Sequence, residues 1–95
     1  MEFRLIKSPN PEKKWRAIFT DKAGKETHTD FGAAGMSDYT QHRDPLRKQR
    51  YLLRHRTREN WKDPKTAGAL SRWILWNEPT LAGSIKSFKT RFSLA

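Results

Sequence analysis

The chain has 95 residues and a formal charge of +10, because 20 lysines and arginines outnumber 10 aspartates and glutamates. Independent cores usually need about 50 to 200 residues, so this length predicts a single domain over residues 1–95 and excludes a multidomain enzyme. The absence of cysteine excludes a disulfide, a thiolate zinc site and a thiol nucleophile. Four Trp, five Phe and two Tyr residues partly compensate for a hydrophobic fraction of only 35%, so we expect a folded chain with a small core.

No membrane segment is predicted. Residues 1–7 lack the basic start and apolar run of a signal peptide, and no stretch approaches 18 apolar residues. We therefore expect no membrane insertion and an intracellular location.

Residues 1–31 have the pattern of a three-stranded antiparallel meander. Residues 3–7, 14–20 and 26–31 are short runs rich in β-branched and aromatic residues, and the second run alternates Trp15, Ala17 and Phe19 with more polar positions. The segment 8–11 contains two prolines and predicts a turn, and Gly24 stands where a hairpin loop needs a positive φ.

Residues 32–43 follow neither period and are predicted to form a loop, after which a basic helix is expected over residues 44–60. Asp44 is a suitable N-cap and Pro45 suits the first helical position. The spacing of the arginines by three or four residues places them on one face of this helix, and leaves Leu46, Leu53 and Tyr51 for packing. The arginines concerned are Arg47, Arg50, Arg54 and Arg58.

Two amphipathic helices are predicted within residues 66–92, separated by Pro79. In the second of these helices Leu81, Ile85, Phe88 and Phe92 recur at helical spacing and form an apolar stripe. The fold class predicted for the chain is therefore α+β, with a small N-terminal three-stranded antiparallel sheet followed by about three helices.

Charge is concentrated in the middle of the chain, where residues 42–65 carry nine basic and three acidic side chains. Arginine binds phosphate and carboxylate bidentately, and planar rings can stack on bases, so this composition is typical of a surface that contacts an anionic partner. An acidic protein surface, a nucleic acid phosphate backbone and a merely solvated face all fit, and Tyr51 and Trp61 also suit a core. The candidate partner-binding or phosphate-binding residues are Arg43, Arg47, Lys48, Arg50, Tyr51, Arg54, His55, Arg58, Trp61 and Arg72.

A catalytic metal site is a weaker hypothesis. The histidines and nearby aspartates could in principle serve a small metal-dependent nuclease, but their spacing matches no ligand pattern, and a metal needs three or four converging ligands. We expect no catalytic residue, no bound metal and no cofactor. The residues considered are His28, His42, His55, Asp30, Asp38 and Asp44.

The middle and C-terminal segments resemble a family of small, basic, uncharacterised proteins of large nucleocytoplasmic DNA viruses, including the giant and algal viruses. The resemblance covers residues 26–92. It is carried by FGAAGMSDYT at 31–40, His42-Arg43-Asp44, Arg47-Lys48, Arg50-Tyr51, Arg54-His55, Glu59, Trp61, LSRWILWN at 70–77 and SIK at 84–86.

This resemblance implies a protein of virus particles or virus factories and brings no catalytic residues with it. The leading hypothesis is a non-enzymatic structural protein, a minor capsid or cement component whose basic helix binds acidic neighbours in a larger assembly. The alternative is a non-specific DNA-binding or RNA-binding protein of genome packaging, and the second alternative is the small nuclease. The expected location is the virion, with the host cytoplasm or virus factory during assembly.

Overall fold

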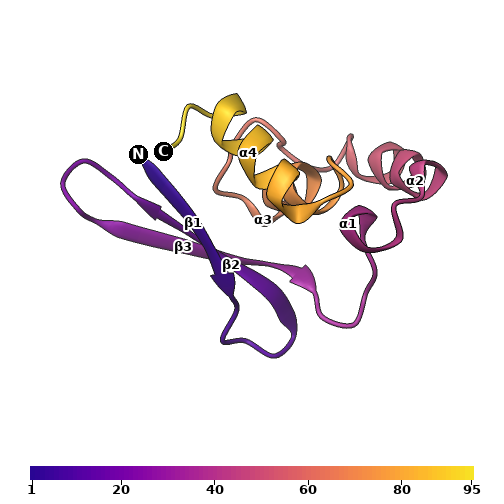
Figure 1. Cartoon of the computed structure of the whole chain (residues 1–95), viewed down its shortest axis with the longest axis horizontal. Coiled ribbons are helices and arrows are strands. Elements are labelled where there is room, and N and C mark those ends of the chain that lie inside the picture. Colours follow the sequence, from indigo (N-terminus) through magenta and orange to yellow (C-terminus); the bar gives the residue numbers. More distant parts are fainter.

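The structure, a computed structural model that describes residues 1–95, confirms the predicted α+β arrangement (Figure 1). An antiparallel sheet comes first and the helices follow it. The elements are β1 (Glu2–Lys7), β2 (Lys13–Thr20), β3 (Glu26–Ala33), α1 (Tyr39–His42), α2 (Pro45–His55), α3 (Ala67–Leu70), the π-helix η1 (Ser71–Leu75) and α4 (Leu81–Arg91).

The three strands form a meander in the order β1-β2-β3, and the predicted strand positions are correct to within two residues. Phe3 pairs with Phe19, and Trp15 pairs with Phe31, so the strand alternation places these rings on one face. The turn between β2 and β3 is held by Asp21, whose carboxylate accepts hydrogen bonds from the backbone N–H groups of Ala23 and Lys25. Gly24 adopts φ 83° there, as the sequence predicts.

The core lies between one face of the sheet and the C-terminal helices (Figure 1). Phe3 and Phe19 from the sheet meet Phe88 of α4 at ring centroid distances of 4.8 to 6.5 Å, and Leu70 and Ile74 complete the cluster. Each buried aromatic ring removes about 150 to 250 Å² from water, which lets a chain with few aliphatic residues sustain a core. The predicted apolar stripe of α4 is confirmed.

The opposite face of the sheet is covered by paired charges. Arg4 pairs with Glu26 at 3.4 Å, and Arg16 binds both oxygens of Asp30 at 2.8 and 3.1 Å. The hydrogen bonds from Arg16 hold the pKa of Asp30 below its usual value. These charges neutralise one another, so this face has no strong attraction for an ionic partner.

Three boundaries differ from the sequence prediction. The one-turn helix α1 forms inside the predicted 32–43 loop because Asp38 caps it. Helix α2 ends at His55 rather than at residue 60, and the turns that follow bring Glu59 against His55 and Trp61. The helix predicted from residue 66 is α only over α3 and continues as η1, where the N–H of Trp76 donates to the carbonyl of Ser71 at 3.0 Å.

None of the helices combines the length and the apolar character that crossing a membrane would require.

Candidate partner-binding face of helix α2

Helix α2 starts where the sequence predicts because Asp44 caps it. One carboxylate oxygen of Asp44 accepts hydrogen bonds from the N–H groups of Leu46 and Arg47 at 2.9 and 3.4 Å. Pro45 occupies the first helical position, where its missing N–H costs nothing. In Figure 1, α2 and the 21–25 turn lie at opposite ends of the long axis of the molecule. The arginine-rich segment therefore lies far from the β2–β3 turn, and it faces the sheet where β2 begins and β3 ends.

The inner face of α2 is aromatic. Tyr51 is buried, and its ring lies between Trp76, at a centroid distance of 4.3 Å, and His55, at 4.2 Å. Burial raises the pKa of the Tyr51 phenol above its ordinary value. Both faces of the ring are covered, so Tyr51 cannot stack on a nucleic acid base while α2 holds this position.

Three of the predicted site cations bind main-chain carbonyls of the segment that follows η1. Lys48 donates to the carbonyl of Asn77 at 2.6 Å, Arg72 donates to that of Trp76 at 3.0 Å, and Arg43 donates to that of Pro79 at 3.1 Å. A main-chain carbonyl oxygen carries partial negative charge and accepts hydrogen bonds from the N–H groups of cationic side chains. These three side chains thus join α1, α2 and η1, and they are engaged within the protein.

Arg72 is held further by aromatic rings. Its guanidinium carbon lies 4.2 Å from the ring centroid of Trp73 and 5.4 Å from that of Trp61. Burial, followed by repulsion from Arg91, lowers the pKa of Arg72. No carboxylate pairs with this guanidinium and its Nε has no partner, so Arg72 is a half-buried cation without a counter-charge.

Two further residues of the predicted site, His55 and Trp61, both bind the carboxylate of Glu59. Glu59 lies 2.8 Å from Nδ1 of His55 through one oxygen and accepts a hydrogen bond from Nε1 of Trp61 at 3.1 Å through the other. The carbonyl of Trp61 in turn accepts a hydrogen bond from Nε1 of Trp73 at 2.8 Å. His55 and Trp61 therefore fix the turn after α2 and are not free to meet a partner.

The remaining arginines are exposed and have no acidic partner. None of the four ion pairs in the structure involves them. The acidic side chains nearby bind other groups: Asp44 caps α2, and Asp63 accepts a hydrogen bond from the N–H of Lys65. Glu59 binds His55 and Trp61. The predicted single face is confirmed for the three arginines within α2, while Arg58 lies in the following turn and donates to the carbonyl of Arg54. The unpaired arginines are Arg47, Arg50, Arg54, Arg56 and Arg58.

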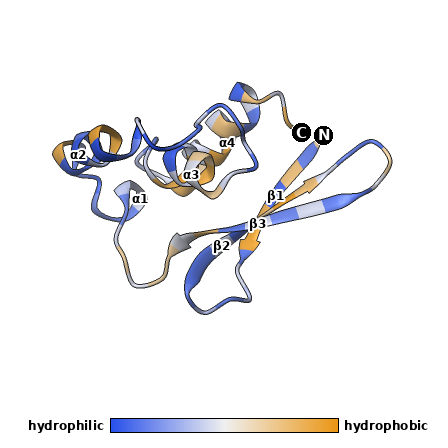
Figure 2. Ribbon diagram, turned by 180° about the vertical axis from the view of Figure 1, so that it is seen from behind, coloured by the Kyte–Doolittle hydropathy of each residue, from blue (hydrophilic) through white to orange (hydrophobic).

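Two leucines expected to pack are instead exposed beside these arginines. Leu46 is 62% exposed and Leu53 is 54% exposed. Positions 46, 50 and 53 follow one face of a helix, so Arg50 lies between the two leucines. Figure 2 shows apolar segments on α2, at the end of the molecule away from the sheet. We refer to Leu46, Arg47, Arg50, Leu53 and Arg54 as the α2 outer face.

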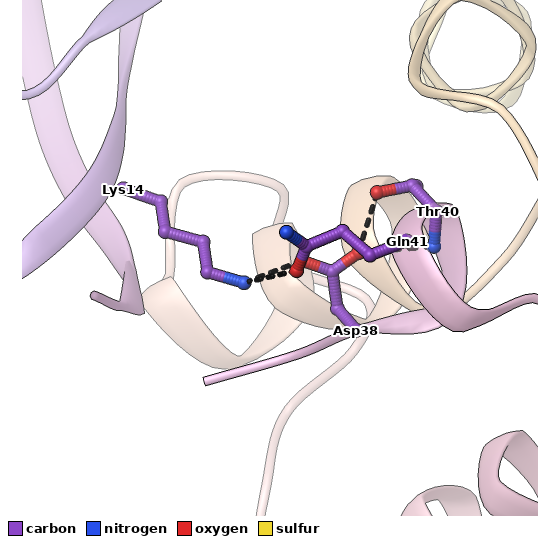
Figure 3. Close-up of polar contacts among 4 residues, drawn as sticks. All are labelled: Lys14, Asp38, Thr40 and Gln41. Carbon is purple, nitrogen blue, oxygen red and sulfur yellow. Dashed lines mark hydrogen bonds and ion pairs between the residues drawn. The ribbon is translucent and has the colours of Figure 1, made fainter. Parts of the chain in front are cut away.

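A cleft of about 390 Å³ adjoins this face, between α2, the start of α3, the adjacent ends of β2 and β3, and the chain segment that follows β3. A mostly buried ion pair that the sequence did not indicate holds its outer wall: Nζ of Lys14 lies 2.6 Å from Asp38 and 3.1 Å from the amide oxygen of Gln41, and Asp38 also binds Thr40 (Figure 3). Asp38 followed by Thr40 is a helix-capping signal that could have revealed α1.

The histidines and aspartates considered for a metal site are dispersed. His28 is exposed on β3, His55 binds Glu59, and Nδ1 of His42 accepts a hydrogen bond from the N–H of Asp44 at 2.9 Å. Asp30 and Asp38 pair with basic residues. No group of three or more His, Asp or Glu side chains converges in the structure.

Comparison with known protein families gives a match over more than half of the chain. The sequence pattern of a family described as a family of unknown function, DUF5754, matches residues 3–55. These residues begin in β1 and end at the last residue of α2, so the match includes both the sheet and the α2 outer face. No curated protein and no solved structure matches the chain.

Proposed function

The chain belongs to the DUF5754 family, and from that premise we propose that it is a non-enzymatic binding protein whose α2 outer face attaches to an acidic protein surface. The observation that carries this proposal is the combination, on one helix face, of arginines without acidic partners and two exposed leucines. Leucines at i and i+7 with an arginine between them suit a helix that docks in an apolar groove with acidic edges.

The positive charge of the α2 outer face would suit phosphate groups as well as carboxylates. Its two exposed leucines, Leu46 and Leu53, favour a protein partner over a nucleic acid. A phosphate backbone is contacted by cations and hydrogen-bond donors, and it gains nothing from apolar side chains. Protein interfaces combine buried apolar anchors with arginine and exclude most other charged residues from their centre. Leu46 and Leu53 flank Arg50 in that manner.

The aromatic residues give a second argument for a protein partner. Proteins that bind single-stranded nucleic acid present open ring faces on which successive bases stack. Both ring faces of Tyr51 are covered, and His55 and Trp61 are engaged by Glu59. Nucleic acid would therefore be bound through its phosphates alone, and this is the second candidate function, favoured by the five unpaired arginines of residues 47–58.

The setting we propose is the particle of a large DNA virus, where the chain would be a minor capsid or cement protein. This part of the proposal is supported by the resemblance of residues 26–92 to small basic proteins of such viruses. A cement protein needs rigid anchors that meet fixed neighbours, and α2 is held rigidly by the stacked Tyr51 and by Lys48. In such a particle the protein should co-purify with genome-free shells, and recovery only with the released genome would favour the second candidate.

The two candidates separate in a binding experiment with purified protein and two probes. One probe is a synthetic amphipathic helical peptide with leucines on one face and glutamates beside them, and the other is a random-sequence DNA duplex. Both are titrated from about 50 to 200 mM salt, the range in which phosphate-driven affinity drops by orders of magnitude. We expect the peptide to bind more tightly near physiological salt and with the shallower salt dependence.

Variants then assign the binding to the α2 outer face. We expect Leu46→Ser with Leu53→Ser to weaken peptide binding by roughly tenfold, since each leucine buries apolar surface in the complex. Ile6→Ser, which changes an exposed apolar residue on the opposite sheet face, is the matched control. Tight duplex binding that the leucine variants leave unchanged would refute the protein-surface proposal and support phosphate binding.

A further inference from the structure

The cleft beside α2 is large enough to receive a side chain of a partner. Its volume of about 390 Å³ lies within the range usual for small-molecule and peptide side-chain sites. Arg54 lines this cleft and also belongs to the α2 outer face, so the two surfaces are continuous. A segment bound to the outer face would therefore lie next to the opening of the cleft.

The accessible apolar surface of the cleft comes from a few residues. Trp76 is half-buried and lines the cleft, while Phe31 and Leu75 lie behind it and are almost fully buried. Met36 lines it from the segment after β3 and is 65% exposed. Methionine is flexible and polarizable, and adapts its shape to different apolar groups. These residues favour an apolar side chain as the occupant.

Both carboxylates that line the cleft already have partners within the protein. Asp38 pairs with Lys14 at 2.6 Å, and Glu59 lies 2.8 Å from Nδ1 of His55. Two further cations, Lys13 and Arg54, are exposed and make no ion pair. The charge that the cleft leaves unsatisfied is therefore positive, and it belongs to these two side chains.

From this arrangement we propose that the cleft receives an apolar side chain from an acidic segment of the protein partner, while flanking carboxylates of that segment pair with Lys13 and Arg54. The inference rests on the proposed function and specifies how the cleft recognises the protein partner. A nucleotide base suits the cleft less well, because Tyr51 covers one face of the Trp76 ring and His42 lies 5.3 Å from it by ring centroids.

Two capped peptides test the proposal: Asp-Asp-Phe-Asp-Asp and Asp-Asp-Ser-Asp-Asp, which carry the same charge. Each is titrated into the full chain while the indole N–H signals of the tryptophans are followed by NMR, with the Trp76 signal assigned from Trp76→Phe. We expect the phenylalanine peptide to shift the Trp76 signal saturably and to bind at least about tenfold more tightly than the serine peptide, because only the former buries a ring.

Variants of the cleft sharpen the test. Lys13→Gln with Arg54→Gln should weaken the phenylalanine peptide by roughly tenfold, since two charge-assisted contacts are lost. Lys22→Gln with Lys25→Gln changes two exposed lysines at the opposite end of the molecule, and should leave binding unchanged. Ser37→Phe fills the cleft from its exposed wall and should abolish the Trp76 shift, whereas Ala82→Phe on the exposed side of α4 should not.

Three results would overturn the inference: equal affinities for the two peptides, binding of the phenylalanine peptide without a Trp76 shift, and no binding of either peptide at about 1 mM. A thymidine pentanucleotide that shifts Trp76 more strongly than the phenylalanine peptide would also overturn it in favour of a nucleic acid ligand. If the cleft fails while Leu46→Ser with Leu53→Ser still weakens the amphipathic helical peptide, the proposed function stands without the cleft.

Discussion

Tyr51 of α2 lies flat against Trp76, with ring centroids 4.3 Å apart and ring planes only 4° apart. Tyr51 is the only residue of α2 that is fully buried, so this contact is the main apolar attachment of the helix to the rest of the chain. Lys48 adds a polar attachment at the same side through the carbonyl of Asn77. The orientation of the α2 outer face thus depends on this stacked pair and on the Lys48 hydrogen bond.

Replacing Tyr51 by Ala should destabilise the protein by about 3 kcal/mol, because a large buried ring is removed and its cavity cannot fully collapse. The free energy of unfolding is measured by urea titration with tryptophan fluorescence. Leu53→Ala is the matched control in the same helix, and its effect should stay within about 0.5 kcal/mol because the side chain is exposed. A loss below about 1 kcal/mol in Tyr51→Ala would contradict the attachment role.

Tyr51 also predicts a dependence of stability on alkaline pH. Burial raises the pKa of this phenol in the folded protein, so the phenol stays protonated there while it ionises in the unfolded chain. Above about pH 10 the unfolded state then binds fewer protons, and stability falls as pH rises. Tyr51→Phe should reduce this fall, as measured by urea unfolding between about pH 8 and 11. Identical pH profiles for the two proteins would show that Tyr51 is not the group responsible.

The ion pair between Lys14 and Asp38 should contribute strongly to stability. Asp38→Asn leaves a mostly buried ammonium without its counter-charge and should cost about 3 kcal/mol. The double variant Lys14→Met with Asp38→Asn should lose less than Asp38→Asn alone, since no unpaired charge is left. As a control, Arg4→Met with Glu26→Gln removes an exposed pair and should change stability by no more than about 1 kcal/mol. Additive effects at Lys14 and Asp38 would argue against direct coupling.

Removing an arginine from the α2 outer face should stabilise the isolated protein. Arg50 lies three residues after Arg47 and four before Arg54, and like charges at these spacings repel by about 0.2 to 0.5 kcal/mol per pair. Arg50→Gln should therefore raise the melting temperature at low salt, and the gain should shrink at about 1 M salt, where the charges are screened. Arg4→Gln, which breaks an ion pair, should give no such gain. A lower melting temperature for Arg50→Gln would mean that Arg50 has an intramolecular role.

The sequence pattern was sufficient to predict the elements that local residue preferences determine. The strands follow from alternation and from the turn at Gly24, and the start of α2 follows from Asp44 and Pro45. The end of α2 did not follow, because residues 46–60 contain no glycine or proline, yet the chain turns after His55 and brings Glu59 against His55 and Trp61. The widened turn of η1 has no sequence signature at all.

The sequence predicted which basic residues lie in the candidate site, and only partly which of them are exposed. Arginine spacing alone placed Arg47, Arg50 and Arg54 on one exposed face. The same reasoning could not separate them from Lys48 and Arg72, which are equally basic but lie against carbonyls brought close by the fold. The contact between Lys14 and Asp38 joins β2 to the cap of α1, and such a contact becomes visible only when the chain is folded.

The π-helix η1 makes the whole arrangement sensitive to the length of the chain. A π-helical turn holds one residue more than an α-helical turn, and here it allows Ile74 and Leu75 to reach the core while Trp76 turns toward Tyr51. Leu75 packs in the core against the sheet and the next residue, Trp76, stacks on Tyr51, so the wide turn sets the placement of both. Loss of a single codon there would close the wide turn and disturb the core and the attachment of α2 together.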